Sequence, residues 1–255
     1  SGTKSAVVVG GGFIGLEMAE NLHRAGLTVT VVEASDQVMA PLDFEMAQLL
    51  HEHLAQKGAE LHLSDGVASF EDTAEEVTVT LKSGTKLSAG LVVLAIGVRP
   101  NGELAKEAGL EVNSRGGIAV SAGMRTSDPC IYAVGDAAEI EDFIDRSRTM
   151  IPLAGPANKQ GRIAADNIAG GNEVYDGTQG TSVVKVFDMT AASTGQNEKT
   201  LVKKGLVKGK DFETLIVTQN SHASYYPGAV PMNLKLIFSK DGKKIYGAQS
   251  VGSDG

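Results

Sequence analysis

The sequence is poor in cysteine and in aromatic residues. Its 255 residues include one cysteine, Cys130, and no tryptophan, and aromatic residues make up 5% of the chain. A single cysteine excludes an intrachain disulfide and a cysteine-rich zinc site, and it is compatible with a reducing compartment. We therefore predict a cytoplasmic protein with a mainly aliphatic core.

Long hydrophobic runs and an excess of positive charge are also missing. The longest apolar run, Leu91 to Ile96, has the length of a strand and falls far short of the ~20 residues of a membrane-spanning helix. Lys and Arg number 23 against 31 Asp and Glu, which gives a net charge of −8. A field of this sign repels polyanions, so we expect neither nucleic acid nor a membrane as a partner. The five histidines show no metal-ligand spacing, and no metal site is predicted.

The first hundred residues alternate strands and helices in the order typical of a parallel α/β sheet. We expect strands over 5–9, 28–33 and 91–96, helices over 13–25 and 43–57, and a hairpin of 77–81 with 85–87. The strand 91–96 is predicted to be fully buried. The buried face of the second helix is expected to consist of Phe44, Ala47, Leu50 and Leu54.

The rest of the chain has a different character. We expect a short helix over 103–108, a strand over 131–134, a helix over 157–169 and a linker over 170–180. Strands over 183–187, 212–217, 234–238 and 245–249, with one lysine-rich helix among them, predict an α+β unit. Both ends of the chain look like cuts in a longer protein.

A glycine-rich turn follows the first strand and opens the first helix. Gly10, Gly12 and Gly15, with Phe13 and Ile14 between them, fit the G-x-G-x-x-G pattern of dinucleotide-binding turns. The first glycine permits the tight turn, the second lets the backbone approach a pyrophosphate, and the third lets helix and strand pack closely. The alternative is an ordinary glycine-rich connection between a strand and a helix.

Glu33 strengthens the dinucleotide interpretation. It ends the second strand, 18 residues after Gly15, where a carboxylate can accept hydrogen bonds from the ribose hydroxyls of NAD. A carboxylate there repels the 2′-phosphate of NADP, and no arginine follows it in residues 34–39, so NADH is favoured over NADPH. The alternative for Glu33 is a solvated carboxylate at the end of a strand, and Glu17 in the first helix could act through the helix dipole alone.

Three segments then occur in order: GGGFIGLE at 10–17, AIGVRPN at 95–101 and TSDPCIYAVGD at 126–136. Together they resemble the FAD-dependent pyridine nucleotide-disulfide oxidoreductases. Residues 221–229, SHASYYPGA, are similar to the dimerisation-domain loop of the coenzyme A-disulfide reductase, NADH oxidase and NADH peroxidase branch. The resemblance covers almost the whole chain.

The resemblance implies roles on the NADH side and on the FAD side. Phe13 matches an aromatic that gates the nicotinamide pocket, Glu17 an acid that meets the carboxamide, and Gly97 the end of the strand beneath NADH. On the FAD side the matching residues are Gly135, Asp136, Ala154 and Asn158. Among these, Asp136 matches the aspartate that binds the ribityl chain, and Asn158 in the coenzyme A branch lies near the substrate. The alternative for Asp136 is an N-cap of the following segment.

The departures from the family pattern are at the start of the chain. A complete member begins with a second glycine-rich segment for FAD and then a redox cysteine, and neither pattern occurs here. Cys130 lies in a strand-entry segment without an activating pattern, and we expect it to be a packed structural thiol rather than a nucleophile. We therefore expect no catalytic residue in this chain and, for the chain alone, no disulfide reductase activity and little bound FAD.

The resemblance and the patterns predict the following domains. Residues 1–113 form a Rossmann-like NAD(P)H-binding domain, α/β in class, with a three-layer parallel sheet and a β-hairpin or meander insertion. Residues 114–175 form the C-terminal segment of the FAD domain, and 176–255 a truncated α+β dimerisation domain. The intact flavoprotein is expected to be a homodimer that passes hydride from NADH to FAD and then, through a cysteine, to a disulfide.

Other acceptors and other functions stay open. Coenzyme A disulfide or a persulfide is the first expectation, with oxygen or peroxide as alternatives for a small-molecule acceptor. A non-catalytic NADH-binding module and a flavin reductase serving a ferredoxin-like protein are the rivals. Tyr225 and Tyr226, with His222, are predicted to line a substrate pocket of the opposite subunit, with the two rings on opposite faces of an extended segment. Their alternative is a pair of half-buried surface aromatics that support the turn.

Overall fold

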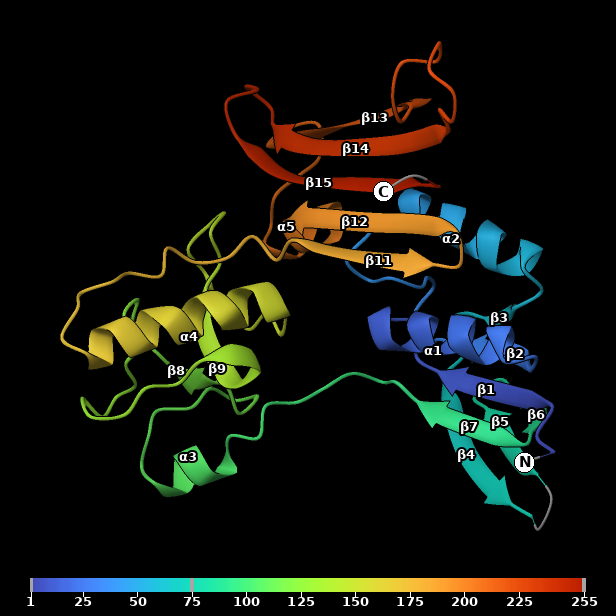
Figure 1. Cartoon of the computed structure of the whole chain (residues 1–255), viewed down its shortest axis with the longest axis horizontal. Helices are drawn as coiled ribbons and strands as arrows, with labels where there is room; N and C mark the ends of the chain where they lie inside the picture. Colours follow the sequence, from blue (N-terminus) through green and yellow to red (C-terminus); the bar gives the residue numbers. More distant parts are fainter. Residues whose placement is uncertain (1, 74–75, 254–255) are drawn as a thin grey trace. The chain divides into compact units, whose positions relative to one another are not determined.

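The computed structural model describes residues 2–73 and 76–253. The chain divides into two compact units (Figure 1). The first unit holds Ser1–Gly97, Val183–Ser193 and Asn197–Gly255, and the second holds Val98–Ser182 and Thr194–Gln196. The three domain ranges expected from the sequence stay a prediction, since these units are defined by packing alone. Among the described residues, no helix is both long and apolar enough to cross a membrane.

A four-stranded parallel sheet forms the centre of the first unit. Its order is β3(Glu60–His62), β2(Thr28–Val32), β1(Ser5–Val9) and β7(Leu91–Leu94). The helices α1(Phe13–Arg24) and α2(Phe44–Gln56) connect the first three strands in sequence. The run of β-branched residues in β1 and β2 suits strands that are covered on both faces. This order places the carboxyl ends of β1, β2 and β7 along one edge of the sheet.

Different layers cover the two faces of this sheet. Alternation along β1 sends Val8 to one face, where it packs against Ala19 of α1. It sends Val7 to the other face, against a meander of β4(Val67–Asp72), β5(Val77–Leu81) and β6(Lys86–Ala89). Helix, parallel sheet and meander make three layers (Figure 1), which confirms the fold class expected from the sequence.

The first unit also contains a five-stranded sheet. Its order is β11(Ser182–Val186), β12(Met189–Gly195), β15(Ile245–Gly252), β14(Pro231–Ser239) and β13(Phe212–Asn220). A short helix, α5(Glu198–Lys203), follows β12. The buried side chains of Val186 and Val251 belong to one core with Leu50 and Leu54 of α2, so this sheet packs on the helix layer. The α+β expectation for this stretch is confirmed.

The second unit is smaller. It holds α3(Glu103–Glu107), the three-stranded sheet β10(Arg148–Thr149), β9(Ala138–Glu141) and β8(Ile118–Ala119), and α4(Ala154–Ile168). A single 3₁₀ turn, η1(Gly135–Ala137), precedes β9. Met124, Ile140 and Ile163 lie in its core with Tyr175. The helix α4 begins three residues before the expected Ala157 and ends at Ile168.

Three local expectations are wrong. Residues 131–134 form no strand, because their backbone makes only a single bridge, between Tyr132 and Arg125. Cys130 is exposed rather than packed, since it lies in this irregular segment. Phe44 is 47% exposed at the first position of α2, and Met46 takes its place in the core.

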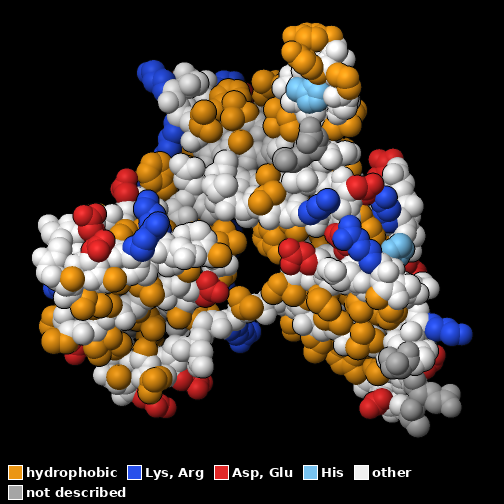
Figure 2. All heavy atoms as spheres, in the orientation of Figure 1, with side chains coloured by type: hydrophobic (Ala, Val, Ile, Leu, Met, Phe, Trp, Pro, Cys, Tyr) orange, Lys and Arg blue, Asp and Glu red, His pale blue; other side chains and the backbone are white. Residues whose placement is uncertain are grey.

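The strand β7 is also less buried than expected. It lies at the edge of the parallel sheet and ends at Leu94, whose side chain is 60% exposed, and Ile96 beyond it is 75% exposed. Hydrophobic side chains gather on the surface where β7 and β4 lie (Figure 2). The uninterrupted apolar run therefore identifies a strand correctly but not its burial.

Candidate functional site

The turn between β1 and α1 depends on two glycines. Gly10 has a φ of +112°, and a Cβ there would lie 2.2 Å from the carbonyl oxygen of Ala95. A Cβ on Gly15 would lie 1.8 Å from the carbonyl oxygen of Gly10. The first glycine thus permits the turn and the third permits close packing of helix and strand, as the sequence indicates.

Gly12 is not required by the fold. Its φ is −81°, which any residue adopts, and a Cβ there would meet no atom within 4 Å. It is the N-cap residue of α1 and offers no side chain to the free N–H groups of the first turn. The open space at Gly12 therefore lies at a helix N-terminus, where an anionic group such as a pyrophosphate is favoured.

Glu33 ties this turn to the end of β2. One carboxylate oxygen, Oε2, accepts a hydrogen bond from the backbone N–H of Gly11 at 2.7 Å. The other, Oε1, accepts from the backbone N–H of Ser35 at 2.8 Å and from its hydroxyl at 2.9 Å. A carboxylate has about four acceptor positions, so one stays open for a ribose hydroxyl. Glu33 is thus bound to the glycine-rich turn as well as being partly solvated, and its contact with a ribose stays a prediction.

These residues line one cavity of about 570 Å³, a size typical of small-molecule sites. Its walls come from the ends of β1, β2 and β7, the loop after β2, and the meander. The lining residues are Val9, Gly10, Gly11, Gly12, Val32, Glu33, Ala34, Ser35, Gln37, Ala40, Gly66, Val67, Ala68, Phe70, Lys82, Leu94, Ala95, Ile96 and Gly97.

Four of the predicted NADH-site residues, Gly10, Gly12, Glu33 and Gly97, line this cavity. The others lie on α1 outside its walls. Ile14 is 54% exposed and Glu17 is also exposed. Phe13 is partly buried against the hydrophobic core that contains Leu50 and Leu54 of α2. The structure therefore places Phe13 and Glu17 near the turn, and their contacts with a nicotinamide stay predictions.

Sequence reasoning missed several wall residues. Gln37 and Ala40 belong to the loop between β2 and α2, and Lys82 follows β5 of the meander. Lys82 is the one cation among the described lining residues. No local pattern marks them, because they reach the cavity only through long-range packing of loop and meander.

In the second unit, Asp136 lines a separate cavity of about 170 Å³ with Arg99, Arg115 and Pro152. Asp136 lies inside η1, whose N-cap is Val134, so the alternative of an N-cap role is wrong. The backbone N–H of Gly135 donates to Oε1 of Gln160 in α4 at 2.7 Å. The Gly-Asp pair is thus fixed against α4, with the carboxylate of Asp136 exposed.

The remaining FAD-side residues lie at the start of α4. Ala154 is the first residue of that helix, and Nδ2 of Asn158 donates to its carbonyl oxygen at 2.9 Å. Asn158 lines a shallow surface hollow with Gly161 and Arg162. The cavity at Asp136 and the hollow at Asn158 have no lining residue in common.

The loop between β13 and β14 carries the two tyrosines. Tyr225 is 82% exposed and Tyr226 61% exposed, and their ring centroids lie 5.0 Å apart. His222 is exposed in the same loop. The expectation that the rings point to opposite faces is wrong, because the segment forms turns rather than an extended strand. Hydrophobic side chains are exposed on the surface at this loop (Figure 2).

Comparison with known proteins identifies the family. Residues 1–161 match the pyridine nucleotide-disulphide oxidoreductase family, and residues 181–255 match its dimerisation domain. The chain belongs to this family.

Similar proteins act on sulfur compounds or carry the name of an oxidase. The chain is 35% identical over 252 residues to the NAD(P)H sulfur oxidoreductase (CoA-dependent) of Pyrococcus furiosus, covering 98% of this chain and 56% of that protein. It is 37% identical over 257 residues to the NADH oxidase of Methanocaldococcus jannaschii, covering 100% of this chain and 55% of that protein. The structure of reduced CoADR-RHD from Bacillus anthracis superimposes with a TM-score of 0.94 at 51% identity, covering 99% of this chain and 44% of that one. The chain thus spans about half the length of the curated relatives it matches.

Proposed function

We propose that the chain is the NADH-binding and dimerisation part of a flavoprotein oxidoreductase. In the whole protein, hydride is passed from NADH to FAD and on, through a cysteine, to a disulfide such as coenzyme A disulfide or to a persulfide. The observation that carries the proposal is the open space at Gly12. Its missing side chain serves no packing purpose, yet it leaves space at a helix N-terminus inside a cavity that also contains Glu33.

The residues of this chain bind and orient the dinucleotide. The N-terminus of α1 at Gly12 would hold the pyrophosphate, and the remaining acceptor position of Glu33 would hold a ribose hydroxyl. Asp136, exposed beside α4, would hold the ribityl chain of FAD. The bound cofactors supply the hydride chemistry, and the protein supplies position and electrostatics.

The identity of the compound that finally accepts the electrons is a more specific part of the proposal. A sulfur acceptor is supported by the name of the Pyrococcus relative, an NAD(P)H sulfur oxidoreductase (CoA-dependent). Oxygen or peroxide is the second candidate, supported by the Methanocaldococcus relative named an NADH oxidase. A homodimer is supported by the match to the dimerisation domain. A cytoplasmic location stays a prediction.

Direct titration tests the proposal. NADH added to the 255-residue chain should bind at one site, measured by calorimetry or by the change in NADH fluorescence. Gly12→Val should remove this binding, because its side chain fills the space at the helix N-terminus. An absence of NADH binding to the unaltered chain would refute the dinucleotide site. In the whole protein, stopped-flow absorbance should show flavin reduction by NADH before the acceptor is reduced.

A further inference from the structure

The loop between β2 and α2 forms one wall of the dinucleotide cavity. Ser35, Gln37 and Ala40 of this loop line the cavity, yet residues 33–43 contain no helix or strand. Met39 has a φ of +52°, and its N–H donates to the carbonyl oxygen of Gly11 at 2.8 Å. The wall therefore connects to the glycine-rich turn and needs external contacts to keep this conformation.

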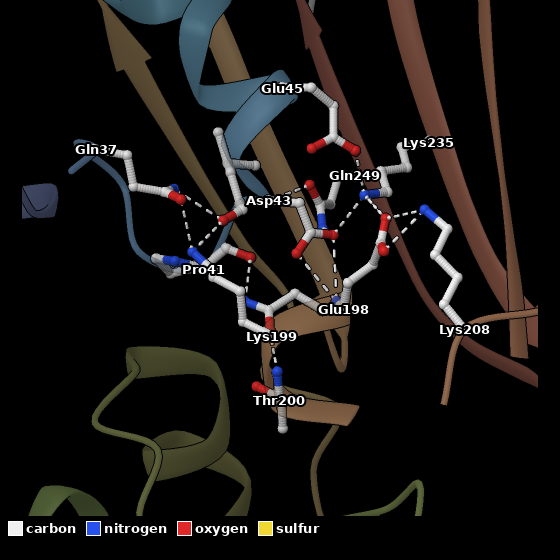
Figure 3. A network of polar contacts seen from close by, with 12 residues as sticks. Gln37, Pro41, Asp43, Glu45, Glu198, Lys199, Thr200, Lys208, Lys235 and Gln249 are labelled. Carbon is white, nitrogen blue, oxygen red and sulfur yellow. Dashed lines mark hydrogen bonds and ion pairs between the residues drawn. The ribbon is translucent and has the colours of Figure 1, made fainter. Parts of the chain in front are cut away.

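Lys199 of α5 supplies such contacts from more than 150 residues away in the sequence. Its ammonium donates to Oε1 of Gln37 at 2.9 Å, to the carbonyl oxygen of Ala40 at 3.1 Å and to that of Leu42 at 2.8 Å. An ammonium has three N–H donors, so these three acceptors match its full capacity. All three acceptors are neutral groups of the loop rather than carboxylates. Figure 3 labels Lys199 and one of its partners, Gln37.

Gln37 connects Lys199 to the rest of the loop through hydrogen bonds of its side-chain amide. Its side chain is 3% exposed, and its Nε2 lies within hydrogen-bond distance of the carbonyl oxygens of Val38, Met39 and Leu42. Oε1 of the same amide accepts from Lys199. Loss of the ammonium would leave this buried oxygen without its partner and free the loop to rearrange.

The helix that carries Lys199 is itself fixed. Asn197 caps α5 through Oδ1 and also donates from Nδ2 to the carbonyl oxygens of Ala40 and Pro41. The backbone N–H of Glu198 donates to the carboxylate of Asp43 at 3.0 Å. Lys235, whose side chain is fully buried, forms ion pairs with Asp43 and with Glu198 (Figure 3). The start of α5 and the end of the loop are thus held together by contacts of Asn197 and Glu198, the two residues before Lys199.

We propose that Lys199 is a positioning residue of the dinucleotide pocket, through which α5 fixes the cavity wall at Gln37 and Ala40 and sets the affinity for NADH. This inference rests on the proposed function, because it takes NADH as the ligand of the cavity. It assigns to α5, in the part of the chain that matches the dimerisation domain, a role in cofactor binding.

The test compares Lys199→Met with Lys208→Met in the full chain. Methionine is unbranched like lysine, is one atom shorter, and removes the three donors. NADH affinity should fall by about tenfold in Lys199→Met, as expected for the loss of a few hydrogen bonds that position a binding wall. Lys208 pairs with Glu198, and within the described part of the chain it has no hydrogen bond or ion pair to the loop. Lys208→Met therefore removes a charge from the same region and should bind NADH as the unaltered chain does.

Chemical rescue separates positioning from a general loss of structure. In a Cys130→Ser background, Lys199→Cys should bind NADH weakly, and alkylation with bromoethylamine should restore the ammonium and most of the affinity. Hydrogen exchange at the amides of residues 38–40 and 42 should be faster in Lys199→Met and unchanged in Lys208→Met. Equal NADH affinity in Lys199→Met and the unaltered chain would overturn the inference while the proposed function stands. Failure of the unaltered chain to bind NADH would overturn both.

Discussion

The carboxylate of Glu33 accepts a hydrogen bond from the backbone N–H of Gly11 over 2.7 Å, so the end of β2 is tied to the glycine-rich turn after β1. This contact places negative charge beside the predicted ribose position. NADH should therefore bind more tightly than NADPH, whose 2′-phosphate lies close to the carboxylate. The difference should be about 5- to 150-fold, or about 1–3 kcal/mol, measured by titration of both nucleotides.

The Glu33→Gln variant tests the cause of this preference. An amide keeps one oxygen acceptor and removes the charge, so the difference between NADH and NADPH should shrink. NADH itself should bind more weakly, because one of the contacts to Gly11 and Ser35 loses its acceptor. Equal or better binding of NADPH by the unaltered chain would contradict the role given to Glu33.

Gly12 and Gly15 should respond differently to the same substitution. Gly15→Ala places a Cβ 1.8 Å from the carbonyl oxygen of Gly10 and should lower the free energy of unfolding by at least about 2 kcal/mol. Gly12→Ala meets no atom within 4 Å and should cost at most about 1 kcal/mol as a poorer N-cap. Urea denaturation measures both, and NADH titration should show weakened binding in Gly12→Ala. Loss of stability without loss of binding at Gly12 would contradict the site.

His51 should make folding stability depend on pH. Its Nε2 accepts from the backbone N–H of Val38 at 3.0 Å, which requires a neutral ring. Burial lowers the pKa of His51 from its usual 6.5, and the nearby Asp36 only partly opposes this. The unfolded chain thus takes up a proton at a higher pH than the folded chain. Stability should be complete above about pH 6.5 and fall below it, by at most about 1.4 kcal/mol per pH unit.

The control for this dependence is His51→Gln. Glutamine can accept from Val38 but does not titrate, so the difference in unfolding free energy between the variant and the unaltered chain should change between pH 7 and pH 5. Carboxylates such as Asp65 and Asp241, whose pKa values are lowered by hydrogen bonds from Ser83 and Ser239, titrate below this range. A difference that stays constant with pH would show that His51 does not titrate on unfolding.

Lys235 should be important for stability. Its side chain is 0% exposed and pairs with Asp43 at 2.8 Å and also with Glu45 and Glu198. Burial disfavours the charge, but hydrogen bonds to these three carboxylates outweigh it and raise the pKa of Lys235. Lys235→Met leaves the buried Asp43 uncompensated and should cost about 3–5 kcal/mol. Lys208→Met, at a half-exposed position, should cost under about 1 kcal/mol in the same denaturation experiment.

Local patterns were sufficient for three of the four strands of the parallel sheet, for the helices α1 and α2 and for the glycine-rich turn. Gly10, Gly15 and Glu33 could be recognised because strand, turn and helix signals lie within a few residues of one another, and backbone geometry then determines the rest. The pairing of Lys235 with Glu45 could not be recognised, since 190 residues separate them and a lysine inside a strand usually faces solvent. Gln37 and Lys82, which line the cavity, could not be recognised either, because they reach it only through packing between segments distant in the sequence.

The failure around Cys130 has a different cause. Residues 131–134 contain β-branched and aromatic side chains, which favour a strand. Side chains compete for the preceding backbone instead. The N–H of Cys130 donates to Oδ1 of Asp128 at 2.8 Å, and the hydroxyl of Thr126 lies within hydrogen-bond distance of the carbonyl oxygens of Asp128 and Ile131. Such local bonds favour turns over strands, and they leave Cys130 at the surface.

Tyr225 and Tyr226 give the last prediction, which concerns the whole protein. Both rings are exposed and tilted against each other, so replacing either residue with Phe should leave stability within about 0.5 kcal/mol. If the hydroxyl of either tyrosine contacts the acceptor in the substrate pocket of the opposite subunit, at least one variant should turn over the acceptor more slowly while flavin reduction by NADH stays normal. Because exposed aromatic pairs of this kind need a partner to bury them, we expect this outcome rather than a purely supporting role. Steady-state and stopped-flow kinetics separate the two, and normal rates in both variants would exclude hydroxyl chemistry at this loop and leave the packing explanation.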